Sequence, residues 1–399
     1  MAIYPSAKLV ITGIGFVSPL GRAPNSFARK LIAGESGIHM KRFKRHQTGM
    51  PIGTASGIIK TTGPKRWPIG RCTAISLEAA ERALAGAKLP PDFDKARLGV
   101  IHATVRGNLK SLFSYRAEIR DFGLGKTSAM EFPNTIMHSS AAFLSVATGA
   151  KAFNLSLSAG ATSAIEALTR AEYMLEAGLC DYCLCIASED VSFELLAFLE
   201  GNNEMETSYP DPFGVQRAGY ALGEAAIALL CERRDTANDH KLIPRVEFLG
   251  SSTFHRVDSA TRYAAVISEA LTDAGIGPNE IGMVVSSANG SQTDKLEAEA
   301  ISRVLGHAVP VTAPKGTFGD CGAASVFLGL IAMLYTHYQG FCPPTLGRSA
   351  YDPALPPINL IRSPRRIDGD IVLLTSLEFA GPSGALVMAM PSREKAERP

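Results

Sequence analysis

Short apolar runs rich in Val, Ile and Leu alternate with segments whose apolar residues recur at helical spacing, and this alternation constrains the fold most strongly. Lys8–Val17 and Arg97–Thr104 have the composition of buried strands, and the Ala- and Leu-rich segment Ala74–Ala87 between them is typical of a helix. Two further runs, Gly219–Cys231 and Arg245–Ser252, are long enough to pair with each other as strands. Strands separated by helices of this length favour an α/β fold with parallel strands in its core.

The same order of strands and helices occurs a second time after residue 240. Asp258–Ala274 has the apolar spacing of a helix, and Ile281–Ser287 has the composition of a buried strand. The sequence therefore predicts an internally duplicated fold, with one half at residues 1–240 and the other at residues 241–399.

The charge balance excludes several classes of function. Lys and Arg number 40 and Asp and Glu 38 among 399 residues, so the formal net charge is only +2. Such a balance lacks the electrostatic footprint of a protein that binds nucleic acid or an anionic membrane. The N-terminus lacks a signal-peptide pattern, and no apolar run approaches the roughly 18 residues of a membrane span. We therefore expect a soluble, cytoplasmic protein with neither nucleic acid nor membrane as a partner.

Two short motifs could indicate a cofactor or a metal, but both favour a structural role. Thr12–Gly15 follows the first strand, as a dinucleotide-binding loop would, yet Ser18 replaces the third glycine of that motif and Pro19 follows it. Cys180 and Cys183 form a lone CxxC pair with no second pair and no histidine cluster. We expect no cofactor and no metal site.

Six motifs are spread in order over nearly the whole chain: Leu9–Gly15, Ser18–Gly21, Phe132–Ile136, Pro212–Glu224, Asp294–Ala300 and Pro314–Ala324. Together they resemble those of the β-ketoacyl synthase family, the condensing enzymes of fatty-acid and polyketide assembly. One such motif would be a weak signal, whereas several in the same order are specific. The resemblance implies the duplicated α/β thiolase fold, layered α-β-α-β-α, which agrees with the repeated order of elements.

The resemblance also implies a chemistry that depends on three groups. A Cys at a helix N-terminus takes the acyl chain, because the helix dipole favours the thiolate, and two His residues support decarboxylation and the developing oxyanion. In this sequence Ala161 stands where the family has the Cys, and Asn289 and Asp320 stand where it has the two His residues. An alignment on the glycine and alanines that follow would instead bring Gly319 to the third position. With all three groups absent, the resemblance implies that this chain performs no condensation.

A fourth departure lies in the loop that covers the active site in the family. The family sequence Phe-Gly-Phe-Gly-Gly is replaced here by Leu377–Gly381, with Glu378 in place of the first glycine. The Glu378 carboxylate either fills the former acyl entrance or points outward into solvent, and the sequence favours neither arrangement.

Some family members are inactive subunits called chain length factors, and the chain resembles these. By the resemblance, such a subunit pairs with an active ketosynthase, which supplies the Cys and both His residues and receives the acyl carrier protein, while the inactive subunit closes the far end of the product tunnel. The cavity-lining candidates that set chain length are Leu109, Leu112, Phe113, Leu377 and Glu378. The interface candidates are Phe132, Met137 and His138.

Other functions and two product classes stay open at this stage. A stand-alone acyltransferase or decarboxylase would need a substitute nucleophile, and the candidates for it are Ser158, Thr162, Ser163 and Cys321. A purely structural stabiliser would never line the cavity. A chain length factor could serve the synthesis of an aryl polyene, which we prefer on family-level similarity, or of an aromatic polyketide.

The candidates for recruiting an acidic acyl carrier protein are the basic residues of Lys41–Arg45 with Lys60, Lys65 and Arg66.

Overall fold

The structure is a computed structural model that describes residues 9–42, 50–55, 67–90, 92–201, 208–239, 244–366 and 369–391. Within these ranges, none of the helices combines the length and the apolar character that a membrane crossing needs.

The first half of the chain forms five strands of the main sheet, in the spatial order β5-β4-β6-β8-β1. In that order they are β5 (Asn154–Leu157), β4 (Leu98–Ala103), β6 (Tyr182–Glu189), β8 (Ala225–Arg233) and β1 (Leu9–Val17). Strand β4 pairs in parallel with β5 and β6, whereas β8 is antiparallel to both β6 and β1. Strands β4, β6 and β1 are buried along their whole length, as expected for strands covered on both faces.

The second half repeats this arrangement in the order β11-β10-β13-β14-β9, with a short strand β12 added outside β11. In that order they are β11 (Pro310–Thr312), β10 (Met283–Val285), β13 (Ile371–Ser376), β14 (Gly381–Ala389) and β9 (Val246–Val257), with β12 at Asn359–Leu360. Strand directions also repeat, because β10 is parallel to β11 and β13 whereas β14 is antiparallel to β13 and β9. The duplication is therefore one of topology as well as of element order. The predicted boundary between residues 240 and 241 lies outside the described residues.

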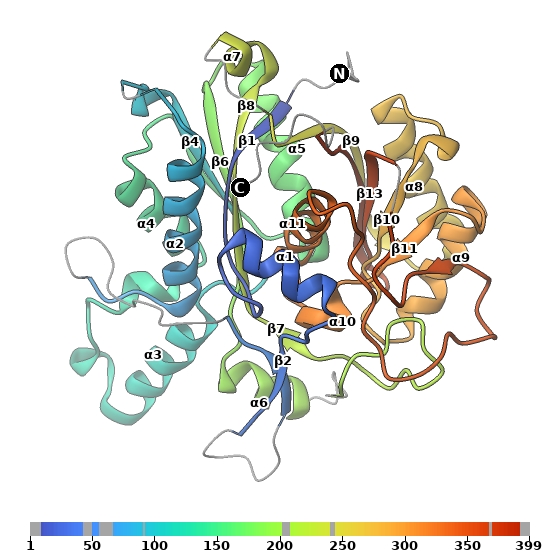
Figure 1. Cartoon of the computed structure of the whole chain (residues 1–399). Helices are drawn as coiled ribbons and strands as arrows, with labels where there is room; N and C mark the ends of the chain where they lie inside the picture. Colours follow the sequence, from blue (N-terminus) through green and yellow to red (C-terminus); the bar gives the residue numbers. More distant parts are fainter. Residues whose placement is uncertain are drawn as a thin grey trace.

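The helices complete five layers, which Figure 1 shows from the side. Helices α2 (Arg71–Gly86) and α4 (Ser139–Thr148) cover the outer face of the first set of strands, and α8 (Ala260–Ala274) and α9 (Thr293–Leu305) cover the outer face of the second. Helices α5 (Ser163–Glu176) and α11 (Ser325–His337) lie between the two sets and share one core cluster with both. This is the duplicated thiolase fold, layered α-β-α-β-α, as the sequence predicted.

The remaining elements lie around these layers. They are α1 (Pro24–Ile32), α3 (Leu109–Phe122), α6 (Phe193–Gly201), α7 (Arg234–Asp239), α10 (Lys315–Phe318) and a small sheet of β2 (Ile38–Lys41), β3 (Met50–Gly53) and β7 (Leu222–Gly223).

Local sequence accounts for the ends of several elements. Helix α8 starts after Ser259, whose hydroxyl accepts a hydrogen bond from the Arg262 amide, and ends at Gly275 in the left-handed region at φ +66°. A Cβ on Gly13 or Gly15 of β1 would lie 2.4 or 2.1 Å from a carbonyl oxygen of α2. These two glycines therefore allow close helix–sheet packing. The motif does not follow the first strand, as the sequence predicted, but lies within β1.

The predicted pairing of the two long runs near the middle of the chain is wrong. Strand β1 lies between β8 and β9 and pairs with both of them. Each repeat places its first strand at the same edge of its own set, so β1 and β9 meet where the two sets join. The runs are adjacent in sequence, but β1 separates them in space.

Both central helices begin in the same way. A 3-10 turn precedes each, at Gly160–Thr162 before α5 and at Gly322–Ala324 before α11. In each case the first serine of the helix accepts a hydrogen bond from the amide four residues earlier, at 2.9 Å for Ser163 and 3.0 Å for Ser325. The two turns contact each other, so the N-termini of two buried helices meet at one place.

Candidate functional site

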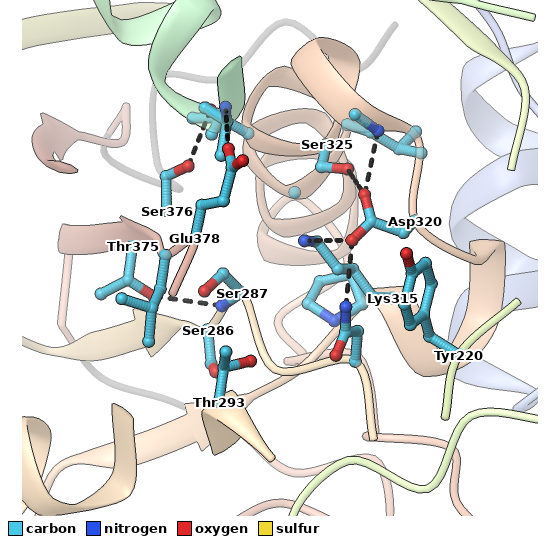
Figure 2. A pocket seen from close by; sticks show the side chains of 18 of the residues that line it. Tyr220, Ser286, Ser287, Thr293, Lys315, Asp320, Ser325, Thr375, Ser376 and Glu378 are labelled. Carbon is cyan, nitrogen blue, oxygen red and sulfur yellow. Dashed lines mark hydrogen bonds and ion pairs between the residues drawn. The ribbon is translucent and has the colours of Figure 1, made fainter. Parts of the chain in front are cut away.

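A cavity of about 300 Å³ lies where the two central helices begin, and both repeats line it (Figure 2). The first repeat contributes Val105, Arg106, Ala161 and Tyr220. The second contributes, among others, Asn289, Lys315, Gly319, Asp320, Ser376, Leu377 and Glu378. The three replaced positions predicted from the sequence, Ala161, Asn289 and Asp320, therefore lie around one cavity.

Ala161 lies in the turn that opens α5, and a segment from the other repeat contacts its peptide on both sides. The Ser376 hydroxyl donates a hydrogen bond of 2.7 Å to the Ala161 carbonyl. The Ala161 amide donates one of 3.3 Å to Oε2 of Glu378. Figure 2 shows the Glu378 side chain directed toward this turn. Glu378 is solvent-exposed as a whole, yet its carboxylate contacts the turn. The sequence had left open whether this side chain fills the former acyl entrance or points into solvent, and the observed arrangement has features of both.

Asp320 lies just before the 3-10 turn that precedes α11, and its carboxylate accepts several hydrogen bonds. Its Oδ2 accepts hydrogen bonds from Lys315 Nζ at 2.8 Å and from Asn289 Nδ2 at 3.1 Å. Its Oδ1 accepts from the Gly322 amide at 3.0 Å and from the Ser325 hydroxyl at 3.4 Å. Asn289 and Asp320, the two residues predicted to replace the family's histidines, are therefore hydrogen-bonded to each other.

The Lys315–Asp320 ion pair is largely removed from water, with side chains 12% and 17% exposed. Burial opposes the charged form of both groups, but their mutual attraction and the hydrogen bonds to the carboxylate outweigh it. The pKa of Asp320 therefore lies below its ordinary value and that of Lys315 above it. The pair is charged at neutral pH, and each charge is already neutralised by the other.

Two buried carboxylates hold the loop that carries Asn289, and the sequence did not predict this role. Asp294 accepts hydrogen bonds from the amides of Phe213, Asn289 and Gly290 at 2.8 to 3.1 Å. Glu297, one helical turn later, accepts from the Ser287 amide at 2.9 Å and from the Thr375 hydroxyl. The available signal was two acidic residues at i and i+3 on the same helix face as the apolar residues Ala298 and Ile301.

The candidate substitute nucleophiles are all engaged or buried. The hydroxyls of Ser158, Thr162 and Ser163 donate to the backbone carbonyls of Val105, Ala159 and Gly160. Cys321 is fully buried and does not line the cavity, and burial raises the pKa of its thiol far above the ordinary range. Within the described part of the chain, none of the four has a histidine as hydrogen-bond partner.

The histidines that the structure describes do not line this cavity. Among the described residues that line it, there is neither a histidine nor a cysteine. His138 is exposed and bonds through Nδ1 to the Ser156 hydroxyl of β5 at 2.8 Å. His102 is fully buried in β4, where burial, with a smaller contribution from His138, lowers its pKa to about 4. Nor do the described residues gather a group of three or more side chains suited to a metal ion.

The predicted chain-length residues fall into two groups. Leu377 and Glu378 line the cavity. Leu109, Leu112 and Phe113 lie on α3, which has no fully buried residue, and none of the three is among the cavity-lining residues. Leu109 packs against a small separate cluster beneath α3, and the other two side chains are half-buried.

The predicted interface residues lie on one exposed apolar face. Phe132 is 52% exposed and Met137 42%, and an open groove of about 240 Å³ beside them is lined by His138, Val146 and neighbouring residues. Strand β5 is next to this groove, and it is the edge of the main sheet. Of the basic carrier-protein candidates, only Lys41 and Arg42 fall within the described residues, and both are exposed.

Comparisons with known proteins match the chain along most of its length. The model of the β-ketoacyl synthase N-terminal domain matches residues 6–237, and that of the C-terminal domain matches residues 247–349. The tetracenomycin polyketide synthase ketoacyl synthase beta subunit of Streptomyces glaucescens is 29% identical over 406 aligned positions, which cover 96% of this chain and 98% of that protein.

Solved structures share the fold. A β-ketoacyl synthase from Burkholderia phymatum has a TM-score of 0.87 at 22% identity, covering 96% of this chain and 100% of its own. A ketosynthase in complex with its chain length factor from Xenorhabdus doucetiae gives a TM-score of 0.81 at 19% identity, covering 98% of this chain and 100% of the matched chain.

Proposed function

The chain belongs to the β-ketoacyl synthase family, and from this premise we propose that it is a non-catalytic chain length factor. In this proposal it pairs with an active β-ketoacyl-acyl-carrier-protein synthase and bounds the tunnel in which a polyketide or polyene grows. The observation that carries the proposal is the composition of the cavity: Ala161, Asn289 and Asp320 surround it, and its described lining holds no cysteine or histidine. A methyl group cannot form a thioester, so the acyl chain must be held by another polypeptide.

The lack of an oxyanion site supports the same proposal. Decarboxylation of a malonyl unit leaves an enolate oxygen that needs hydrogen-bond donors directed at it. Here the Asn289 amide donates to Asp320, and the Asp320 carboxylate would repel a second negative charge. A stand-alone decarboxylase or acyltransferase, the alternative function, would have to displace this network and also free one of the engaged hydroxyls.

The nature of the partner is inferred from similarity and from the exposed apolar face. The relative from Streptomyces glaucescens is by name a beta subunit of a polyketide synthase, and one structural neighbour is a ketosynthase with its chain length factor. Phe132, Met137 and Val146 expose large apolar side chains beside the sheet edge at β5. Contiguous apolar surface of this kind marks an interaction site. We propose that an active ketosynthase covers it and that the carrier protein is recruited through that partner.

The finer product class is also part of the proposal. We propose an aryl polyene as the product, with an aromatic polyketide as the alternative. Condensation alone leaves a β-keto chain in either case, so the pair is assayed together with a ketoreductase, its nicotinamide reductant and a dehydratase. A carrier-bound product with the mass of a conjugated unbranched chain then indicates an aryl polyene, whereas a product that retains its ketone oxygens indicates an aromatic polyketide.

Co-expression with an active ketosynthase of the same family tests the pairing. We expect a one-to-one complex to co-purify. Val146→Asp places a charge in the groove and should abolish co-purification, whereas Leu179→Asp, an exposed apolar residue in the turn between α5 and β6, should leave it intact. A chain that purifies only by itself, or a complex equally stable to both substitutions, would contradict the proposal.

A further inference from the structure

We propose that Glu378 is a built-in blocking group, whose carboxylate occupies the N-terminal turn of α5 and keeps an anion or an acyl thioester from binding there. The inference goes beyond the pairing proposed above, because it concerns the isolated chain. It states that the loss of the cysteine at position 161 is accompanied by a second change that would disable even a restored thiol.

The position of the carboxylate carries the inference. Oε2 of Glu378 accepts the hydrogen bond from the Ala161 amide at 3.3 Å. A Cβ built on Gly160 would lie only 2.7 Å from the same oxygen, so the carboxylate lies directly against the turn. Ala161 and Glu378 both line the cavity, and the carboxylate therefore fills space in front of position 161.

The loop that carries Glu378 is fixed by hydrogen bonds. The fully buried Ser383 hydroxyl accepts from the Glu378 amide at 3.0 Å and donates to the Glu378 carbonyl at 3.1 Å. The next residues close a tight turn through bonds from Gly381 to Glu378 and from Ala380 to Val257. Ala380 holds φ +54°, a left-handed conformation that is unfavourable for an L-residue and is retained here by these contacts.

The other charges around the cavity are neutralised in pairs. Among the described residues that line it, the charged side chains are Arg106, Lys315, Asp320 and Glu378, and Tyr220 is a further titratable group. Lys315 pairs with Asp320 at 2.8 Å, and Arg106 lies 4.0 Å from the buried Glu189. Glu378 has no cationic partner within the described part of the chain. The net charge next to position 161 is therefore negative.

This charge has a measurable consequence for a thiol at position 161. A cysteine at a helix N-terminus normally has a lowered pKa, because the helix dipole favours the thiolate. A carboxylate beside it disfavours the thiolate and cancels that effect. Ala161→Cys alone should thus give an ordinary or raised thiol pKa, at or above about 8.5, and removal of the Glu378 charge should lower it.

The experiment measures alkylation of the purified chain by iodoacetamide between pH 5.5 and 10, counted by intact mass. All seven native cysteines are buried, so the new thiol is the reactive one, and the unsubstituted chain supplies the background. The variants are Ala161→Cys, Ala161→Cys/Glu378→Gln, and the control Ala161→Cys/Glu81→Gln, which removes an exposed charge on the outer helix α2.

We expect Glu378→Gln to lower the thiol pKa by about one unit, which is a tenfold gain in thiolate at neutral pH, and Glu81→Gln to leave it unchanged. Ala161→Cys/Glu378→Asp, which retracts the carboxylate by one methylene, should give an intermediate value and serves if the glutamine variant does not fold. Equal pKa values with and without the Glu378 charge, or an already low pKa in Ala161→Cys alone, would overturn the inference. Either result would leave the proposed pairing with a ketosynthase untouched.

Discussion

Position 161 holds a side chain that cannot attack an acyl thioester, and the polar groups around it are paired with one another. Lys315, Asp320 and Asn289 form one network, and Ser376 and Glu378 hold the peptide of Ala161. A catalytic site would instead leave donors directed at the position where charge develops. At the residue scale, these contacts support the proposal that this chain does not itself catalyse condensation.

The buried ion pair gives a prediction about stability. Asp320→Asn leaves the Lys315 cation buried without its counter-ion, and we expect a loss of about 3 kcal/mol in the free energy of unfolding, measured by urea denaturation. Lys315→Met/Asp320→Asn removes both charges and should recover part of this loss. A single variant as stable as the original chain would show that the pair contributes nothing.

The same pair sets the direction of a pH effect. The folded-state pKa of Asp320 lies below its ordinary value, so its contribution is complete above about pH 4 and is lost as the pH falls through the lower folded value. The Asp320→Asn variant should lack this part of the acid destabilisation.

The motifs in the sequence were enough to predict that Ala161, Asn289 and Asp320 replace the family's catalytic residues. The contacts that these three residues make could not be predicted, because they depend on the fold. Asn289 and Asp320 are 31 positions apart in sequence, and only the packing of two loops brings their side chains to 3.1 Å. The direction of Glu378 could not be predicted, because it depends on Ser383 and on a left-handed Ala380, for which the sequence carries no signal.

At the scale of elements, α3 exposes much of its apolar surface, with Ile119 and Phe122 among the exposed large hydrophobic residues of the described part of the chain. None of its residues is fully buried, although Leu109, Leu112 and Phe113 have the i, i+3 and i+4 spacing of one helix face. That spacing can be seen in the sequence. It could not predict the covering surface, which in our proposal belongs to the ketosynthase.

This arrangement gives a prediction about product length. If α3 forms the floor of the shared tunnel, Leu112→Ala or Phe113→Ala should allow longer products, because the overlap that rejects a further two-carbon unit is removed. Mass spectrometry of carrier-bound products from the reconstituted pair measures the shift. Lys110→Ala, an exposed residue on the same helix, serves as the control. An unchanged length distribution in both variants would contradict the assignment of this floor.

At the scale of the whole molecule, the duplication explains where the cavity lies. Two repeats of the same topology place the N-termini of α5 and α11 together, so a single site draws residues from both halves. The repeated element order made this fold predictable from sequence. The wrong pairing of the two middle runs arose because sequence adjacency does not reveal that β1 inserts between β8 and β9.

Acyl transfer itself tests the central claim most directly. The purified chain, alone and in complex with the active ketosynthase, is incubated with an acyl carrier thioester and malonyl carrier protein, and each polypeptide is weighed by intact mass. We predict that the acyl adduct forms only on the ketosynthase and that the isolated chain gives neither an adduct nor an elongated product. An acylated form of this chain, or extension of malonyl units in the absence of its partner, would contradict the account.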